Sequence, residues 1–227
     1  MDEPRAREVR IPAGAVVLDG DLALPADPRG AVVFAHGSGS GRHSPRNRQV
    51  ASALQQARLG TVLMDLLTAE EESADMRTGH LRFDVGLLAQ RLTAAVDWAA
   101  GQGWAAGLGL GLFGASTGAA AALVAAARRP EAVVAVVSRG GRPDLAGREL
   151  EAVRAPTLLI VGGNDPVVLE LNREALSHLR VEKRLEVVAG ATHLFEEPGA
   201  LDEVSHLAAE WFVQHLAPPG GQAGAGA

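Results

Sequence analysis

One stretch of the sequence, residues 108–127, constrains the fold more than any other. It begins with an apolar run, Leu108–Phe113, that is short enough for a buried strand, and it ends with the alanine-rich run Ala119–Ala127, which favours helix. Residues 114–118, between the two runs, read Gly-Ala-Ser-Thr-Gly and match the G-x-S-x-G pattern. The small residues around Ser116 make room for a sharp strand-to-helix turn that exposes its hydroxyl. A glycine-rich turn without chemistry is the alternative interpretation.

The rest of the chain alternates between patterns of strand and helix. Residues 138–154 are expected to be mostly loop, and Thr68–Asp75 is expected to be an acidic loop. Apolar runs predict strands over residues 8–11, 15–24, 31–35, 60–66, 132–137, 157–161 and 184–188, and amphipathic periods predict helices over about 47–58, 81–99, 169–179 and 201–215. Such alternation predicts an α/β fold with a mostly parallel central sheet and helices on both faces. The first two strands are expected to form a hairpin at the sheet edge.

The length of 227 residues suits one large domain, with no internal repeat and no second domain. We expect this domain to span residues 1–217. From Pro218 the sequence holds only proline, glycine, glutamine and alanine, which predicts a flexible tail over residues 218–227.

Charge and composition exclude several classes of partner. The net charge of −6 and the lack of a basic aromatic module argue against nucleic acid. No apolar run is long enough to span a membrane, and the polar start shows no signal peptide, so we expect a cytoplasmic protein. The chain has no cysteine, which excludes disulfides and thiolate metal sites. The histidines lack paired carboxylates at ligand spacing, so we expect neither a metal nor a cofactor.

A serine nucleophile needs a base and a carboxylate that orients the base. Asp165 follows the strand predicted over 157–161, and His193 follows the strand predicted over 184–188. Both therefore belong at the carboxyl edge of the sheet, together with Ser116. Two alternatives stay open for the acid: Asp165 could simply cap the helix that begins near Pro166, or Asp144, after the preceding strand, could replace it.

Three motifs, taken in order, carry a resemblance to a known family. They are His-Gly-Ser-Gly at 36–39, the pentapeptide at 114–118, and Gly-Asn-Asp-Pro-Val at 163–167 before Gly-Ala-Thr-His-Leu-Phe at 190–195. From about Val16 to Leu216 the chain resembles the α/β-hydrolases of the dienelactone-hydrolase-like group. The resemblance implies the α/β-hydrolase fold and ester hydrolysis. Dienelactone hydrolases proper carry a cysteine where this chain has Ser116, so dienelactone itself is in doubt as the substrate.

The resemblance also implies an oxyanion hole made by the amides of Thr117 and Ser38. Independently of it, the 36–41 loop follows a predicted strand at the carboxyl edge, and its glycines let backbone amides approach a ligand closely. An ordinary tight turn is the alternative. His36 and His43 flank this loop, and either a structural role or a substrate contact is open for them.

Residues 138–154 are short where many hydrolases insert a helical lid, which predicts a minimal lid and a cleft for small soluble esters or lactones. Arg42, Arg46, Arg139 and Arg142 stand near the expected cleft, and arginine forks recognise carboxylates and phosphates, so an anionic substrate is one hypothesis. Solvated surface arginines are the other.

The sequence thus predicts a serine hydrolase of the carboxylesterase type that acts on a small molecule as a monomer or homodimer. Acyl transfer, thioester hydrolysis and peptide hydrolysis use the same triad and stay open. A non-catalytic hydrolase-like binding domain is a further alternative, and the complete set of three residues argues against it.

Overall fold

An eight-stranded sheet forms the centre of the computed structural model, which describes residues 6–216. The strand order across the sheet is β1-β2-β4-β3-β5-β6-β7-β8. The strands are β1 (Arg7–Ala13), β2 (Val16–Ala23), β3 (Gly30–Ala35), β4 (Gly60–Met64), β5 (Gly109–Ala115), β6 (Val133–Arg139), β7 (Thr157–Gly162) and β8 (Lys183–Val188).

The sheet is parallel from β4 to β8, because helical crossovers return the chain to the same edge before each new strand. Only β2 runs against its neighbours, β1 and β4. The predicted hairpin at the sheet edge and the predicted mostly parallel sheet are both confirmed. The carboxyl ends of β3, β5, β6, β7 and β8 therefore meet along one edge.

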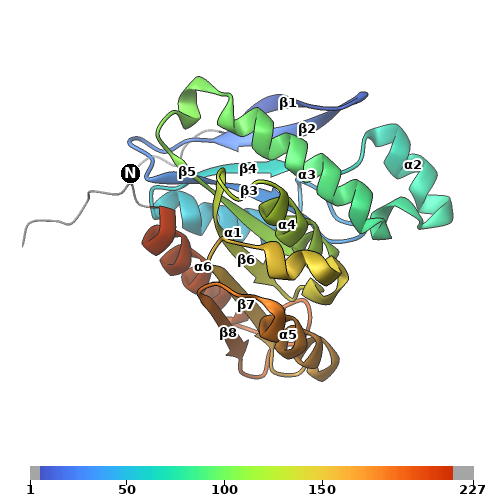
Figure 1. Cartoon of the computed structure of the whole chain (residues 1–227), viewed down its shortest axis with the longest axis vertical. Helices are drawn as coiled ribbons and strands as arrows, with labels where there is room; N and C mark the ends of the chain where they lie inside the picture. The colour runs from blue at the N-terminus through green and yellow to red at the C-terminus, as the bar shows by residue number, and fades with distance from the viewer. Residues whose placement is uncertain (1–5, 217–227) are drawn as a thin grey trace, which may run out of the picture.

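Helices cover both faces of the sheet (Figure 1). On one face, α1 (Pro45–Gln56) and α6 (Ala200–Leu216) pack over a core that includes Phe34, Phe113 and Phe212. On the other face, α3 (Val85–Ala100), α4 (Thr117–Arg128) and α5 (Pro166–His178) cover the second half of the core. The fold is the single-domain α/β architecture that the sequence predicts.

The expected acidic loop after Leu67 is wrong, because the chain forms helix α2 (Ala69–Thr78) there. The Thr68 side chain accepts a hydrogen bond from the Glu71 amide at 3.2 Å, and the Glu71 carboxylate accepts one from the Thr68 amide at 2.9 Å. This reciprocal capping box satisfies two amides at the start of the helix. Gly79 ends the helix in a left-handed conformation with φ 64°. A short 3₁₀ turn, Leu81–Phe83, follows before α3.

Residues 143–152 form short 3₁₀ turns, interrupted at Gly147, rather than a lid. They pack against α4 and α5, beside the sheet. Another short 3₁₀ turn, Gly103–Ala105, follows α3. The flexible tail predicted over residues 218–227 lies outside the described residues.

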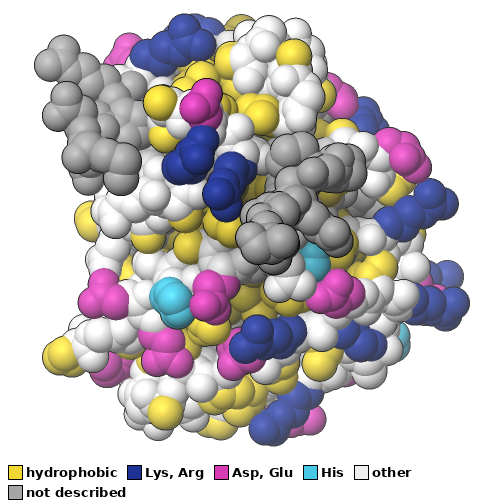
Figure 2. Space-filling view, turned by 90° about the vertical axis from the view of Figure 1, so that its left-hand side faces the viewer, with side chains coloured by type: hydrophobic (Ala, Val, Ile, Leu, Met, Phe, Trp, Pro, Cys, Tyr) yellow, Lys and Arg dark blue, Asp and Glu magenta, His cyan; other side chains and the backbone are white. Residues whose placement is uncertain are grey.

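The end of the molecule where α6 finishes carries charges of both signs. In the part of this end that is visible among the described residues, basic and acidic side chains are interleaved instead of gathering into patches of one sign (Figure 2). Within residues 6–216, no helix combines the length and hydrophobicity that crossing a membrane requires.

The sheet and α6 approach so closely at Gly111 in β5 that no side chain fits there. A β-carbon at this position would lie 2.6 Å from the ring of Phe212, which is fully buried in α6. Gly111 is therefore part of the packing surface for the last helix.

We predict that Gly111→Ala destabilises the protein by about 1–3 kcal/mol, because the added methyl must displace a buried ring. Urea unfolding followed by circular dichroism measures the change. Gly103→Ala is the matched control, since a β-carbon there would meet nothing within 4 Å. Equal free energies of unfolding for the two variants would contradict the prediction, because the Phe212 ring could then move aside without loss of stability.

Candidate active site

Ser116 lies on the turn between β5 and α4 in a strained backbone conformation, with φ 51° and ψ −123°. The two flanking glycines allow this turn because backbone crowds both positions. A β-carbon at Gly118 would lie 2.3 Å from the Ala35 carbonyl oxygen, and one at Gly114 would lie 2.4 Å from Cα of Ala119. The close approach that the pentapeptide predicts is therefore present, and it raises Ser116 at the carboxyl edge of the sheet.

Asp165 and His193 form a hydrogen bond of 2.7 Å between Oδ2 of the carboxylate and Nδ1 of the ring. Asp165 stands at the start of α5, but its side chain makes no capping bond to that helix. The alternative acid, Asp144, binds the guanidinium of Arg142 instead, at 2.7 and 2.9 Å. Of the two predicted acids, the geometry therefore favours Asp165.

The loops after β7 and β8 are tied together, which fixes Asp165 relative to His193. The Asn164 side chain donates to the Gly190 carbonyl at 2.8 Å, and the Asn164 amide donates to the Ala191 carbonyl at 2.9 Å. On the other side of the histidine, the Thr192 hydroxyl donates to the Glu197 carboxylate at 2.6 Å. The loop that carries His193 is thus held on both sides of the residue, and the ring itself is held by Asp165.

The backbone at the end of β6 links the elbow to His193. The Ser116 amide donates to the Arg139 carbonyl at 3.2 Å, and the Ser116 carbonyl accepts from the Arg142 amide at 3.1 Å. Gly140, with φ 50°, lies against the histidine loop, where a β-carbon would be 3.6 Å from Cε1 of His193. The three residues predicted for the triad therefore gather at one edge of the sheet, around the turn that follows Arg139.

Ser38 and Thr117, the two residues predicted for an oxyanion hole, lie side by side. Their hydroxyl oxygens are 3.0 Å apart, and a β-carbon at the neighbouring Gly37 would lie 3.1 Å from Cβ of Ser116. Within residues 6–216, neither the Ser38 amide nor the Thr117 amide donates to a protein acceptor. Both amides are thus available to a ligand next to Ser116.

His36 has a structural role, because both ring nitrogens are engaged. Nε2 accepts a hydrogen bond of 3.0 Å from the Leu66 amide, so Nδ1 carries the proton and donates to the Gly37 carbonyl at 2.9 Å. These bonds tie the 37–39 loop to the end of β4. Burial of the ring holds the pKa of His36 below its ordinary value of 6.5. His43 is exposed beside Arg48, which gives no support for a substrate contact there. His36 also lines the cavity described below, so its structural role leaves a substrate contact open.

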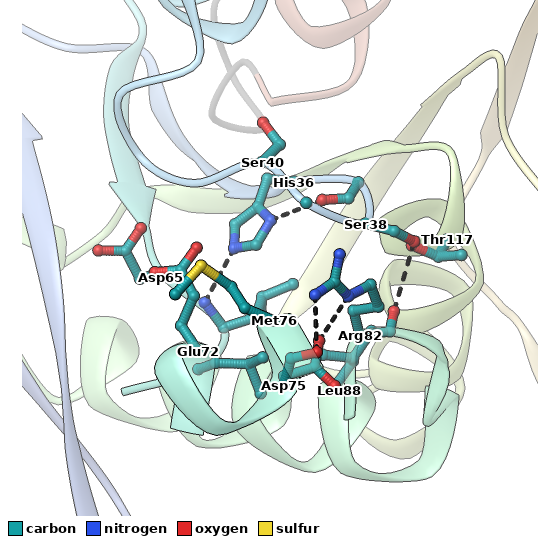
Figure 3. Close-up of a pocket in the computed structure, with 14 residues that line it drawn as sticks. His36, Ser38, Ser40, Asp65, Glu72, Asp75, Met76, Arg82, Leu88 and Thr117 are labelled. Atoms are coloured by element: carbon teal, nitrogen blue, oxygen red, sulfur yellow. Dashed lines mark hydrogen bonds and ion pairs between the residues drawn. The ribbon is translucent and has the colours of Figure 1, made fainter. Parts of the chain in front are cut away.

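A cavity of about 200 Å³ opens beside Ser38 and Thr117 and extends under α2 (Figure 3). Its far wall carries Met76, Arg82 and Leu88. The sequence prediction missed this wall because it placed a loop at 68–75. The T-x-x-E spacing of a capping box at 68–71 is the signal that could have revealed the helix.

The wall of the cavity is braced at both ends of α2. At its end, the buried carboxylate of Asp75 accepts from the Leu81 amide at 2.6 Å and from Nε of Arg82 at 2.5 Å. At its start, Arg91 of α3 donates to the Glu71 carboxylate and to the Ala13 carbonyl, both at 2.8 Å. Arg91 thus joins α2 to the hairpin at the sheet edge.

The structure divides the arginines that the sequence places near the cleft. The geometry does not favour Arg42 as a substrate contact, because the carboxylates of Asp19, Asp21 and Asp65 surround its guanidinium. These carboxylates outweigh the effect of burial and raise the pKa of Arg42. The Arg142 guanidinium is taken up by Asp144, as described above. Arg46 forms an exposed pair of 3.2 Å with Glu196, and Arg139 is buried at the end of β6.

Comparison with known proteins agrees with this architecture. The profile of the dienelactone hydrolase family matches residues 22–215. The chain belongs to the dienelactone hydrolase family. A crystal structure of a dienelactone hydrolase from Anabaena variabilis is 58% identical, with a TM-score of 0.93 over 95% of this chain and all of that one. Est1E of Butyrivibrio proteoclasticus shares the fold, with a TM-score of 0.76 at 14% identity over 91% of this chain and 98% of that one.

Two curated relatives, from two strains of Mycobacterium tuberculosis, are 57% identical over 216 residues, or 95% of this chain. They are provisionally named phosphoribosyl transferases, and the chain spans about half (48%) of their length. The predicted α/β-hydrolase superfamily and the predicted dienelactone-hydrolase-like group are confirmed, and the family is a hydrolase family.

We predict that His36 makes the stability of the protein fall as the solution becomes acidic. The unfolded chain takes up a proton on His36 below about pH 6.5, whereas the folded ring, whose pKa is lowered by burial, resists it. Above pH 6.5, the neutral His36 ring makes its full contribution to the free energy of unfolding. Below pH 6.5 this contribution falls by up to about 1.4 kcal/mol per pH unit.

Urea unfolding at pH 7.5 and 5.5 tests this with His36→Gln, whose amide oxygen can still accept from Leu66. We expect a smaller loss of stability on acidification in this variant than in the unmodified protein. His43→Gln, at an exposed ring, is the control and should behave like the unmodified protein. An unchanged pH dependence in His36→Gln would contradict the prediction.

Proposed function

We propose that this protein is a serine hydrolase of the carboxylesterase type that cleaves small esters or lactones through an acyl-enzyme. The observation that carries the proposal is the 2.7 Å bond between Asp165 and His193 at the sheet edge where the strained Ser116 turn lies. A serine on a sharp turn, a carboxylate and an imidazole at this edge, in the chain order Ser116, Asp165, His193, are the parts that acyl transfer by a triad requires.

In the proposed mechanism, Nδ1–H of His193 donates to Asp165, which leaves Nε2 free to act as a base. Nε2 takes the proton of Ser116 while Oγ attacks the ester carbonyl carbon. The amides of Ser38 and Thr117 stabilise the negative oxygen of the tetrahedral intermediate, and losing one such donor typically costs about 3 kcal/mol. The bond to the alcohol breaks as His193 returns the proton to the leaving oxygen. Water then repeats these steps on the acyl-enzyme and regenerates Ser116.

The cavity beside Ser38 and Thr117 supports a small substrate. Its volume of about 200 Å³ is below the roughly 300–1,000 Å³ of sites that enclose drug-sized ligands. One side of the scissile ester fits into this space, under α2, when the carbonyl oxygen points at the two amides.

Hydrolysis of short-chain 4-nitrophenyl esters tests the proposal. We predict that Ser116→Ala lowers kcat by roughly 10⁴–10⁶-fold and that Asp165→Asn lowers it by about 10⁴-fold, because the histidine then loses its orientation and its tautomer. Asp144→Asn is the matched control: it removes a carboxylate from the same edge, yet it should keep the activity.

Labelling with a fluorophosphonate gives a second readout that does not depend on the ester chosen. Labelling of the unmodified protein and none of Ser116→Ala supports the proposal. Full activity in a folded Ser116→Ala variant would show that another residue is the nucleophile. Addition of hydroxylamine or alcohols during turnover, with analysis of the products, distinguishes hydrolysis from acyl transfer, and thioester and peptide substrates address the other two reactions of the triad.

A second candidate is a hydrolase-like domain that serves a longer protein without catalysis. The observation in its favour is that the chain covers only 48% of the mycobacterial relatives provisionally named phosphoribosyl transferases. The test is the same fluorophosphonate experiment: a folded protein that neither hydrolyses esters nor becomes labelled at Ser116 fits this candidate and contradicts the first.

A further inference from the structure

Arg139 is a buried arginine whose charge has no partner in the part of the chain that the structure describes. Only 8% of the residue is exposed, and its Nη1 is buried without a hydrogen-bond acceptor. No carboxylate within 4.0 Å pairs with it among residues 6–216. An unpaired charge in such a place costs folding free energy, which makes a purely structural role a poor explanation.

The backbone of Arg139 lies beside the proposed triad. Its carbonyl accepts the Ser116 amide, and the next residue, Gly140, lies against the His193 ring. Side chains alternate along a strand, so Arg139 lies on the same face of β6 as Val137, which packs in the core under α1 and α6. The Arg139 side chain therefore starts from the face of β6 that α1 and α6 cover.

Arg46, in the first turn of α1, brings a second positive charge to the same place. Its Nη1 contacts the exposed Glu196 at 3.2 Å, but its Nε is buried without an acceptor in the described chain. Burial, together with the nearby Arg46 charge, lowers the pKa of Arg139 to about 10. Two guanidinium groups thus lie close enough to repel one another, and each has a buried N–H without an acceptor in the described chain.

The carboxylates near this space are occupied by other groups. Glu196 takes Nη1 of Arg46, Glu197 is held by the Thr192 hydroxyl and amide, and Asp202 accepts from Gln49. The free donors of Arg139 and Arg46 are therefore left for an anion that comes from outside the described chain.

We propose that Arg139 and Arg46 form an anion-binding subsite, separate from the oxyanion hole, that takes a phosphate or carboxylate group near the Ser116 turn. Planar guanidinium groups donate to such oxygens in pairs, and an anion between them relieves the repulsion of the two like charges. Either the ester substrate carries the group or a free anion occupies the subsite. A group carried by the ester substrate rests on the esterase function proposed above, whereas the binding of a free anion does not depend on that function.

Titration calorimetry with inorganic phosphate, at an ionic strength held constant with sodium chloride, tests the subsite directly. We expect saturable binding that is at least tenfold weaker in Arg139→Met and several-fold weaker in Arg46→Gln. Arg154→Gln, which alters an exposed arginine paired with Glu131, is the control and should bind like the unmodified protein. Absence of saturable binding, or equal binding by all four proteins, overturns the proposal.

Thermal unfolding separates this proposal from a structural role for Arg139. Without phosphate, Arg139→Met should melt at a higher temperature than the unmodified protein, because it removes an unpaired buried charge. Phosphate should raise the melting temperature of the unmodified protein and leave that of Arg139→Met unchanged. A lower melting temperature of the variant without phosphate would mean that the arginine stabilises the fold, and the subsite would be rejected.

Kinetics with two esters identify the source of the anion. A substrate-borne group predicts that mono-4-nitrophenyl succinate has a lower KM than 4-nitrophenyl acetate, that Arg139→Met removes the difference, and that phosphate competes with the succinate ester. A free anion predicts instead that phosphate changes kcat for the neutral ester without competing. Phosphate binding that persists while Ser116→Ala keeps full hydrolysis would reject only the proposed nucleophile, whereas Ser116-dependent hydrolysis without phosphate binding would reject only the subsite.

Discussion

The close contact between the elbow and its surroundings is the constraint on which the site depends. Ser116 holds a strained conformation because backbone surrounds it: the Ala35 carbonyl presses on Gly118, and the ends of β6 and the following turn bond to its own amide and carbonyl. The strain is therefore offset by packing of β3, β5 and β6, which lie in the centre of the sheet. The proposed nucleophile stands on a turn held by the central strands, whereas its partners come from loops.

Sequence patterns were enough to predict the strands, the main helices and the edge of the sheet at which residues after parallel strands meet. Asp165 and His193 each follow a parallel strand, so the rule that parallel strands end at one edge was enough to place them together. Their hydrogen bond then needed only the cross-links between the two loops, such as the bond from Asn164 to Gly190. The strands and the main helices follow from apolar periodicity for the same reason.

The wrong predictions have two causes. Some depend on contacts between residues far apart in the chain, and one depends on a helix signal that the acidic composition of the segment obscured. The acidic run after Thr68 reads as loop by charge, although its capping box makes it a helix. Arg42 reads as a free cation, but β2 and the end of β4 surround it with carboxylates. No local pattern tells which arginine pairs with an acid and which, like Arg139, has no carboxylate partner among the described residues. Charge pairing across a sheet edge is set by the fold.

The bracing of α2 at both ends has a consequence for substrate selection. The Thr68–Glu71 box and Arg91 fix its beginning, and Asp75 fixes its end through Leu81 and Arg82. A wall held in this way is costly to move, so the cavity behind it keeps its depth as ligands come and go. For the function proposed above, a cavity of fixed depth would select substrates by the length of the group that enters it.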